Sequence, residues 1–554
     1  MKKTLYIGLI ICTGLLYACN DEFLTVAPKS ELTDFTFWKS ESDATMGLAG
    51  CYLNWEQYMN IGMGDAMSDN AWCKNYAYDK FGNGTITPSN SYGGTWVDDE
   101  GKTRGNYRYY PAMWYSYRQI RKYNNFLANI ENVPMNEDTK SRYKGEVRFL
   151  RAYDYFWKVM LYGDMPLVTT IIPADAKLER DPAATLKEFI LRELTEITPM
   201  LPVQNNLESK GHVTRGAAVA LKARLELFMG NYAAALTDAK AVIDMNVYEL
   251  YPNYRTLFLE DSEKDNKEVI LNVQYTRDTH PETFEQLSGT GGDGGWSGFN
   301  AGKSIVDAYE CSNGKTIDDP TSGYDIDNPF KDRDPRLALS IYYPGEYLSP
   351  QYNIERYYNT LDQYRADGSL NPDYHYLPNA SRTGMNTKKY CSMRIPNWGG
   401  YPPNLGNDFH VMRLAEVYLI YAEAAVESGT NTALALEYIN KNRTRVGHVK
   451  ATVLTRELVR RERRVELAFE NLRYFDIARW DIGAQTMDGP FYGSRLGTVD
   501  ATGKVTWKGD GKIVNQDNYI IVENRTFHPE RKYLFPIPQS EIDANPNMVQ
   551  NPGY

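Results

Sequence analysis

The chain has 554 residues and a formal net charge of −10, with 61 Lys and Arg against 71 Asp and Glu. This acidic balance argues against a nucleic-acid-binding protein, because such proteins usually carry an excess of basic residues. Aromatic residues make up 13% of the chain, including 43 Tyr and 10 Trp. Some of these must form a core, but the excess leaves aromatic side chains for a binding surface.

The first residues have the organisation of an export signal. Lys2 and Lys3 precede a mostly apolar run, Leu5 to Leu16, which is too short to cross a bilayer as a helix. The run ends at Leu16-Tyr17-Ala18-Cys19, which resembles the bacterial lipobox, in which the cysteine thiol is diacylated and becomes the new N-terminus. We therefore predict that Cys19 is lipidated and that residues 1–18 are removed. The alternative is an ordinary signal peptide cleaved near Ala18.

The remaining cysteines and the histidines do not form a recognisable metal or disulfide pattern. Cys51, Cys73, Cys311 and Cys391 are widely spaced, without a C-x-x-C pair, and no H-E-x-x-H motif occurs. We predict no cofactor; a structural calcium ion stays open, although no motif indicates one.

Hydrophobic periodicity predicts a mostly α-helical fold. Helical patterns occupy residues 139–162, 215–246, 408–446 and 455–472. Between the two halves of the second segment, Gly230, Tyr232 and Ala235 form a G-x-Y-x-x-A turn that resembles the turn of a tetratricopeptide repeat. We therefore expect a helical-repeat scaffold that supports an irregular, loop-rich face.

Two further segments stand out by their composition. Residues 250–405 are rich in Gly, Pro, Asn and Tyr and have few long periods, which indicates ordered functional loops. The arginine-rich stretch at 456–464 has glutamates at helical ion-pair spacing and an apolar stripe, so we expect a packed or solvated helix there and not a nucleic-acid site.

Several motifs, in this order, resemble the SusD/RagB family of outer-membrane lipoproteins. They are CNDEFL near the N-terminus, EVRFLRAYDYFWKVMLYGDMPLV, RLAEVYLIYAEAA, RRERRVELAFENLRYFDIARW and the closing FPIPQSEIDANPNMVQNPGY. The resemblance implies four tetratricopeptide-like helix pairs and one compact unit, made of an N-terminal region (19–230) and a C-terminal region (231–554). It also implies a surface-exposed lipoprotein that acts as the lid of a SusC-like, TonB-dependent outer-membrane transporter and delivers an oligosaccharide to it.

Two stretches outside the helical segments combine aromatic and polar residues in the way that a sugar site requires. The first, MSDNAWCKNYAYDKFGNG, contains Asp69, Trp72, Asn75 and Tyr78. The second, GTGGDGGWSGFNAGKS, places Trp296 in a glycine-rich loop. A sugar ring stacks its C–H face on an aromatic ring and offers hydroxyls to amides and carboxylates, so we predict a glycan site here.

The family resemblance favours Trp72 and Trp296 as the stacking residues, with Asn75 or Asp69 as the residues that recognise hydroxyl groups. Trp96, in SYGGTWVDD, is a further candidate, as is Trp398, in RIPNWGGYPP. The alternative for each tryptophan is a core position, because large aromatic residues are commonly buried. The loops around 69–96 and 290–300 are expected to meet on one side of the scaffold.

Two other functions stay open. The same family includes lids that capture peptides, and the abundant carboxylates do not exclude a surface glycoside hydrolase. However, no nucleophile motif, P-loop or metal triad stands out. We therefore predict a binding protein and not an enzyme.

Overall fold

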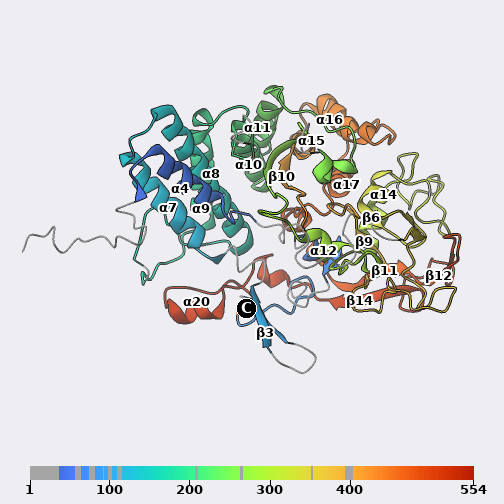
Figure 1. Cartoon of the computed structure of the whole chain (residues 1–554). Helices are drawn as coiled ribbons and strands as arrows, with labels where there is room; N and C mark the ends of the chain where they lie inside the picture. The colour runs from blue at the N-terminus through green and yellow to red at the C-terminus, as the bar shows by residue number, and fades with distance from the viewer. Residues whose placement is uncertain are drawn as a thin grey trace, which may run out of the picture.

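The computed structural model describes residues 37–56, 64–73, 81–91, 93–97, 103–108, 115–173, 175–205, 210–262, 266–350, 354–393 and 404–554. Its long helices run along the left and top of the molecule in Figure 1, whereas short strands, short helices and loops occupy the lower right. The predicted mostly α-helical fold with an irregular, loop-rich part is confirmed.

The long helices pack against one another in chain order. The helices are α4 (Glu41–Tyr52), α7 (Arg118–Asn129), α8 (Glu137–Tyr162), α9 (Ala183–Ile197), α10 (Arg215–Phe228), α11 (Tyr232–Asp244), α15 (Leu414–Ser428) and α16 (Thr432–Arg445). Helix α7 contacts α8, α8 contacts α9, α10 contacts α11, and α15 contacts both α11 and α16. Although residues 245–413 separate them in sequence, α11 and α15 are neighbours, so the helical scaffold is continuous.

Local sequence explains where these helices begin and end. The Asn136 side chain caps α8 by accepting a hydrogen bond from the Thr139 amide at 3.0 Å, and Gly163 ends this helix with a φ of +71°. Between α10 and α11, Gly230 has a φ of +76°, and Ala235 is fully buried on the next helix. The predicted tight turn is present; whether the helix pairs are copies of one repeat stays a prediction.

Two parts of the predicted helices are wrong. Residues Phe409–Arg413 form strand β10, which pairs antiparallel with β4 (Val269–Val273), and α15 begins only at Leu414. Helix α17 (Arg456–Glu466) ends six residues before Leu472, where α18 (Arg473–Trp480) follows. The chain leaves the helix because Phe469 and Asn471 have left-handed backbone and donate their amides to the buried Asp65 carboxylate at 3.0 Å.

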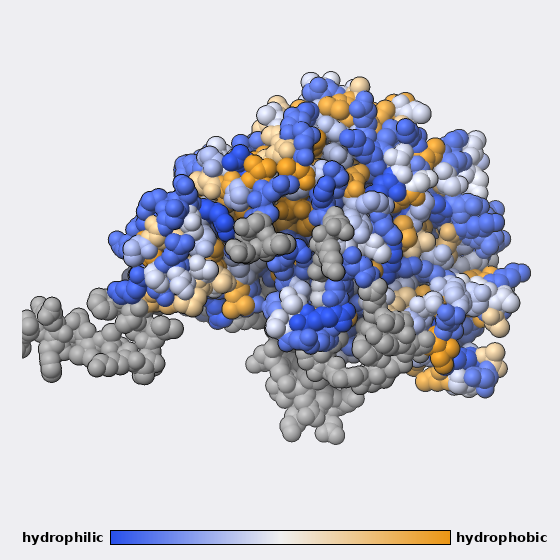
Figure 2. Space-filling model, turned by 45° about the horizontal axis from the view of Figure 1, so that its top comes forward, coloured by the Kyte–Doolittle hydropathy of each residue, from blue (hydrophilic) through white to orange (hydrophobic). Residues whose placement is uncertain are grey.

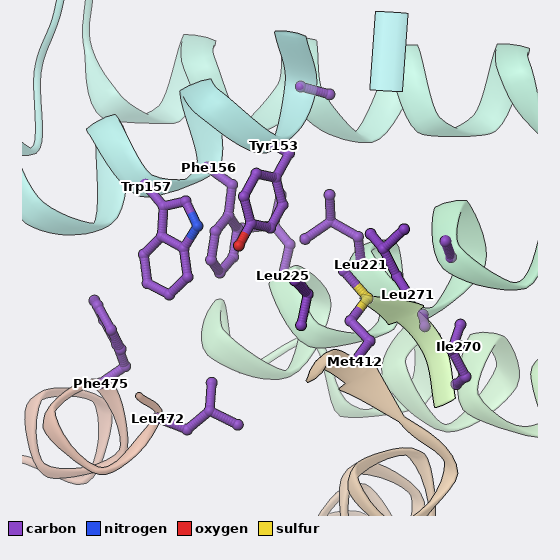
Figure 3. Packing of buried hydrophobic residues seen from close by; sticks show 14 of the residues in the cluster. Tyr153, Phe156, Trp157, Leu221, Leu225, Ile270, Leu271, Met412, Leu472 and Phe475 are labelled. Carbon is purple, nitrogen blue, oxygen red and sulfur yellow. The ribbon is translucent and has the colours of Figure 1, made fainter. Parts of the chain in front are cut away.

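The main hydrophobic core extends from the helices into the β4–β10 pair. In Figure 3, Tyr153, Phe156 and Trp157 point down from one helix toward Leu221 and Leu225. Beyond them lie Ile270, Leu271 and Met412 of the two strands, with Leu472 and Phe475 below. Residues from Ala44 to Met548 belong to this one cluster, so burial of apolar surface ties both sequence regions together.

The irregular part consists of short elements and two-stranded ladders. Its short helices are α12 (Phe284–Ser288), α13 (Lys303–Ala308), α14 (Arg336–Ser340), α19 (Gly483–Thr486) and α20 (Gln539–Ala544). Its strand pairs are β1 (Ala71–Cys73) with β5 (Phe299–Ala301), β2 (Gly93–Val97) with β3 (Thr103–Arg108), β6 (Ile341–Tyr342) with β9 (Asn386–Thr387), β7 (Tyr347–Leu348) with β8 (Arg356–Tyr357), β11 (Gly489–Arg495) with β14 (Tyr519–Arg525), and β12 (Gly497–Val499) with β13 (Val505–Trp507).

The face of the molecule in Figure 2 is largely hydrophilic, with hydrophobic residues in smaller patches. None of the helices in the described residues has the length and apolar character needed to cross a membrane.

Candidate functional site

Strand pairing brings the two predicted aromatic segments side by side. In the β1–β5 ladder, Trp72 lies opposite Asn300 and Cys73 lies opposite Phe299. The Gly302 amide extends the ladder by donating to the Asn70 carbonyl at 2.9 Å. Trp296 comes three residues before β5, so both tryptophans stand on segments that share one ladder. That both rings contact one ligand stays a prediction.

Trp296 is held on a rigid loop and is partly exposed. Its amide donates to the Gln286 carbonyl at 2.8 Å, and the Gly298 amide donates to the Leu287 carbonyl at 2.6 Å. The loop therefore folds back onto α12. A Cβ atom at Gly295 would lie 2.2 Å from the Gly289 carbonyl oxygen, which explains why a glycine precedes this tryptophan.

An ion-pair bridge fixes the other side of the same loop. The Arg356 guanidinium lies between Asp293, at 2.7 Å, and Asp373, at 2.9 Å. Asp373 also accepts a hydrogen bond from the Gly292 amide at 2.7 Å. Burial opposes the charge on Arg356, but the two carboxylates raise its pKa above the usual value. The loop that carries Trp296 is thus anchored to β8 and to the 373 region.

Trp72 is far less accessible than Trp296. Its side chain is 9% exposed, and its indole Nε1 donates to the Glu523 carboxylate at 3.2 Å. Glu523 lies in β14 and pairs with Arg525 at 2.7 Å. Much of the Trp72 ring therefore contributes to packing, and only its remaining exposed part can meet a ligand in this conformation.

Asp69 is part of a buried polar cluster under β1. Its carboxylate is 4% exposed and pairs with Arg473 and Arg464, each at 2.8 Å. Burial alone would raise the pKa of Asp69, but the two guanidinium groups hold it well below its usual range. Arg464 also donates to the Asn70 side chain at 2.9 Å. This geometry positions β1; that Asp69 also binds hydroxyls stays a prediction.

The other predicted residues are described in part or not at all. Trp96 lies in β2, opposite Gly105 of β3, and only the backbone of this hairpin is described. Asn75, Tyr78, Trp398 and the lipidation candidate Cys19 lie outside the described residues. Across the described ranges, no group of three or more His, Cys, Asp or Glu is arranged to hold a metal ion.

Sequence reasoning missed the residues that hold the two tryptophans in place. Arg473 follows Asp69 by 404 residues, and Glu523 follows Trp72 by 451. Arg356 was not singled out either. No local motif marks these partners, because each is a single charged residue in a chain with many.

Comparison with known proteins identifies the family. The model of the family described as "SusD family" matches residues 258–554. The chain belongs to the SusD family. A second model, described as "Starch-binding associating with outer membrane", matches residues 22–227.

Individual relatives in this family are distant but cover most of the chain. A SusD-like protein of Bacteroides ovatus is 24% identical over 607 residues, covering 100% of this chain and 98% of its own. The starch-binding protein SusD of Bacteroides thetaiotaomicron is 25% identical over 470 residues, covering 78% and 76%. The crystal structure of a SusD-like carbohydrate-binding protein from Bacteroides fragilis is 28% identical, covers 93% of this chain and 100% of its own, and has a TM-score of 0.79.

Proposed function

We propose that this protein captures an oligosaccharide at the outer cell surface and delivers it, as a lid, to a SusC-like, TonB-dependent transporter. Membership in the SusD family supports this proposal, as do the relatives from B. thetaiotaomicron and B. fragilis whose names state starch and carbohydrate binding. The observation that carries it is the β1–β5 pairing, which puts the Trp72 segment beside the rigid, glycine-rich loop of Trp296.

The chemistry follows from the exposure of each side chain. Trp296 offers part of an indole face to the C–H side of a sugar ring, and its loop is already ordered, so binding loses little conformational entropy. Trp72 is proposed to offer the ligand only the exposed edge of its ring, while its backbone in β1 holds this segment beside β5. Asn75, Tyr78 and Trp96 are proposed to add hydroxyl contacts and a further ring, whereas Asp69 fixes β1 through Arg464 and Arg473.

Attachment to the membrane is proposed to occur through acyl chains on Cys19. Burying each methylene group in a bilayer contributes about 0.8 kcal/mol, so two or three chains give a stable anchor. With Cys19→Ser, we expect the protein to leave the outer-membrane fraction or to stop maturing. Firm membrane attachment of that variant, together with labelling by a fatty-acid probe, would rule the anchor out.

A glycan array with the mature chain tests the function. We expect binding to a restricted set of oligosaccharides and no release of reducing ends when those glycans are incubated with the protein. Binding only to peptides in a parallel peptide array would replace this proposal with peptide capture, and release of reducing ends would show a hydrolase.

A further inference from the structure

A second hollow lies away from the two tryptophans, at the junction between helices and strands. It has a volume of about 810 Å³, within the range of roughly 300–1,000 Å³ that is typical of small-molecule sites. Its walls come from the segment before α10, the segment after α11, and the β4–β10 pair. No residue of β1, of β5 or of the Trp296 loop lines it.

One wall carries two polar side chains that the protein holds in fixed positions. The Asp408 carboxylate is 5% exposed and accepts hydrogen bonds from the Tyr275 amide at 2.9 Å and the Asn272 side chain at 2.5 Å. The His410 ring, 6% exposed, packs against Phe258 with ring centroids 5.6 Å apart. Nδ1 of His410 has no hydrogen-bond partner in the described part of the chain.

The lining from the segments before α10 and after α11 is also held in place. His212 is fixed by Glu146, whose carboxylate lies 2.7 Å from its Nδ1. The Tyr248 hydroxyl lies 3.3 Å from the Thr214 hydroxyl, and a Cβ atom at Gly216 would lie 2.0 Å from the same Tyr248 oxygen. The small residue at 216 thus lets the Tyr248 ring lie close against α10. The lining is mixed: it includes the apolar residues Val203, Val247, Leu259, Val269, Ile270 and Leu271 and the uncharged polar residues Gln204, Asn205, Ser262, Asn266 and Asn272.

The charges around the cavity favour a neutral saccharide over an acidic one. Burial raises the pKa of Asp408 to about 6, so its carboxylate still carries a negative charge near pH 7, whereas burial lowers the pKa of His410 to about 3 and keeps that ring uncharged. The two ammonium groups that line the cavity, on Lys210 and Lys267, belong to exposed side chains. An anionic ligand would therefore lose its hydration beside the Asp408 carboxylate and without a buried cation to pair with.

We propose that this cavity is a second binding site, which takes a short neutral saccharide or a polyol of similar size. Such a ligand would lay its C–H faces on the aliphatic lining and on Tyr248, and would direct its hydroxyls toward Asp408, His410 and His212. This site does not depend on the glycan site proposed at Trp296, because the two share no lining residue.

Saturation-transfer NMR on the mature Trp296→Ala protein tests this inference while removing the main platform of the other site. The probes are glucose, galactose, mannose, maltose and cellobiose, with galacturonic acid as the charged comparison. We expect at least one neutral probe to bind. Adding Val247→Trp, which puts a larger side chain at a residue that lines the cavity, should weaken the binding of that probe at least tenfold. The matched control, Val453→Trp, changes an exposed valine that does not line the cavity and should leave the affinity unchanged.

The inference is overturned if none of the five neutral probes binds, or if Val247→Trp leaves the affinity of the bound probe unchanged. Tighter binding of galacturonic acid than of every neutral probe would overturn the uncharged ligand class. If circular dichroism shows that the Val247→Trp protein is unfolded, Val203→Trp, at another residue that lines the cavity, replaces it. The same outcomes then apply. The glycan site at Trp296 is judged separately, on proteins with Val247 intact.

Discussion

Trp72 and Trp296 lie on neighbouring segments, but their rings meet different surroundings. Trp296 is partly exposed on a loop fixed by its own backbone, whereas Trp72 is 9% exposed and its Nε1 is bonded to Glu523. A ring in the first setting presents part of its surface to solvent, where a ligand can reach it. A ring in the second setting supports the strand that positions the site.

Replacing Trp72 should therefore cost stability. For Trp72→Ala we expect the free energy of unfolding in urea to fall by about 3–5 kcal/mol, because a mostly buried ring leaves a cavity and Glu523 loses a donor. Trp507→Ala is the matched control, since Trp507 lies partly exposed on the β12–β13 hairpin. If both variants lose the same small amount of stability, Trp72 does not have the packing role assigned to it.

The burial of His410 predicts how the stability of the protein changes in acid. Burial lowers its pKa to about 3, from about 6.5 in an unfolded chain, so the unfolded state binds the proton first as pH falls. The contribution of His410 is complete above pH 6.5 and is lost as pH falls toward 3. His410→Phe keeps a ring beside Phe258 and Tyr390 but cannot bind the proton. When the pH is lowered from 7 to 4, the free energy of unfolding should therefore fall by about 2–3 kcal/mol less in this variant than in the wild type. Parallel pH curves for the two proteins would contradict this.

At the scale of elements, the loop from Gly289 to Gly298 depends on close backbone contacts. Gly295 allows the chain to pass Gly289, and the backbone bonds to α12 follow directly from that approach. The Arg356 bridge to Asp293 and Asp373 holds the middle of the same loop.

Gly295→Ala should shift Trp296 and weaken glycan binding, because the new methyl group would meet the Gly289 carbonyl oxygen at 2.2 Å. We expect roughly a tenfold loss in affinity, or about 1.4 kcal/mol, measured by calorimetry with the glycan found on the array. Gly50→Ala, in α4, is the control, since no heavy atom lies within 4 Å of its added Cβ. Equal affinity for the two variants would show that the loop tolerates displacement.

At the scale of the whole molecule, a buried ion network joins distant parts of the chain. Glu466, at the end of α17, accepts hydrogen bonds from Arg336, Arg413 and Arg445, and Arg413 and Arg445 also pair with Glu268. Arg413, Arg445 and Arg336 lie on different elements. The network therefore fixes how the helical scaffold meets the irregular part.

Glu466→Gln should destabilise the fold strongly, because it removes the carboxylate charge that three buried guanidinium groups share. We expect a loss of roughly 3–5 kcal/mol in the free energy of unfolding, measured in urea. Glu457→Gln, an exposed position on the same helix, is expected to change stability by less than about 0.5 kcal/mol. A loss at Glu466 no greater than that at Glu457 would show that the network contributes little.

The helix predicted at 139–162 is observed as Glu137–Tyr162. The local sequence was enough here, because the hydrophobic periodicity and the terminating Gly163 both act within this one helix. It was not enough at Phe409–Arg413, which is a strand only because β4 lies beside it. The helix predicted to Leu472 ends at Glu466 because of Asp65, which is distant in sequence. At the site, composition pointed to Trp296, but the burial of Trp72 and the arginine partners of Asp69 depend on tertiary contacts.

The central claim, that Trp296 is a stacking platform for an oligosaccharide, is tested most directly by calorimetry. The mature wild type, Trp296→Ala and the control Trp507→Ala are titrated with the glycan found on the array, after circular dichroism shows that all three are folded. Stacking on part of an indole face buries some tens of Å² at roughly 25 cal/mol per Å², or about 1–2 kcal/mol. The account predicts an affinity about tenfold lower or more for Trp296→Ala and no change for Trp507→Ala. Unchanged affinity in the folded Trp296→Ala protein would contradict it.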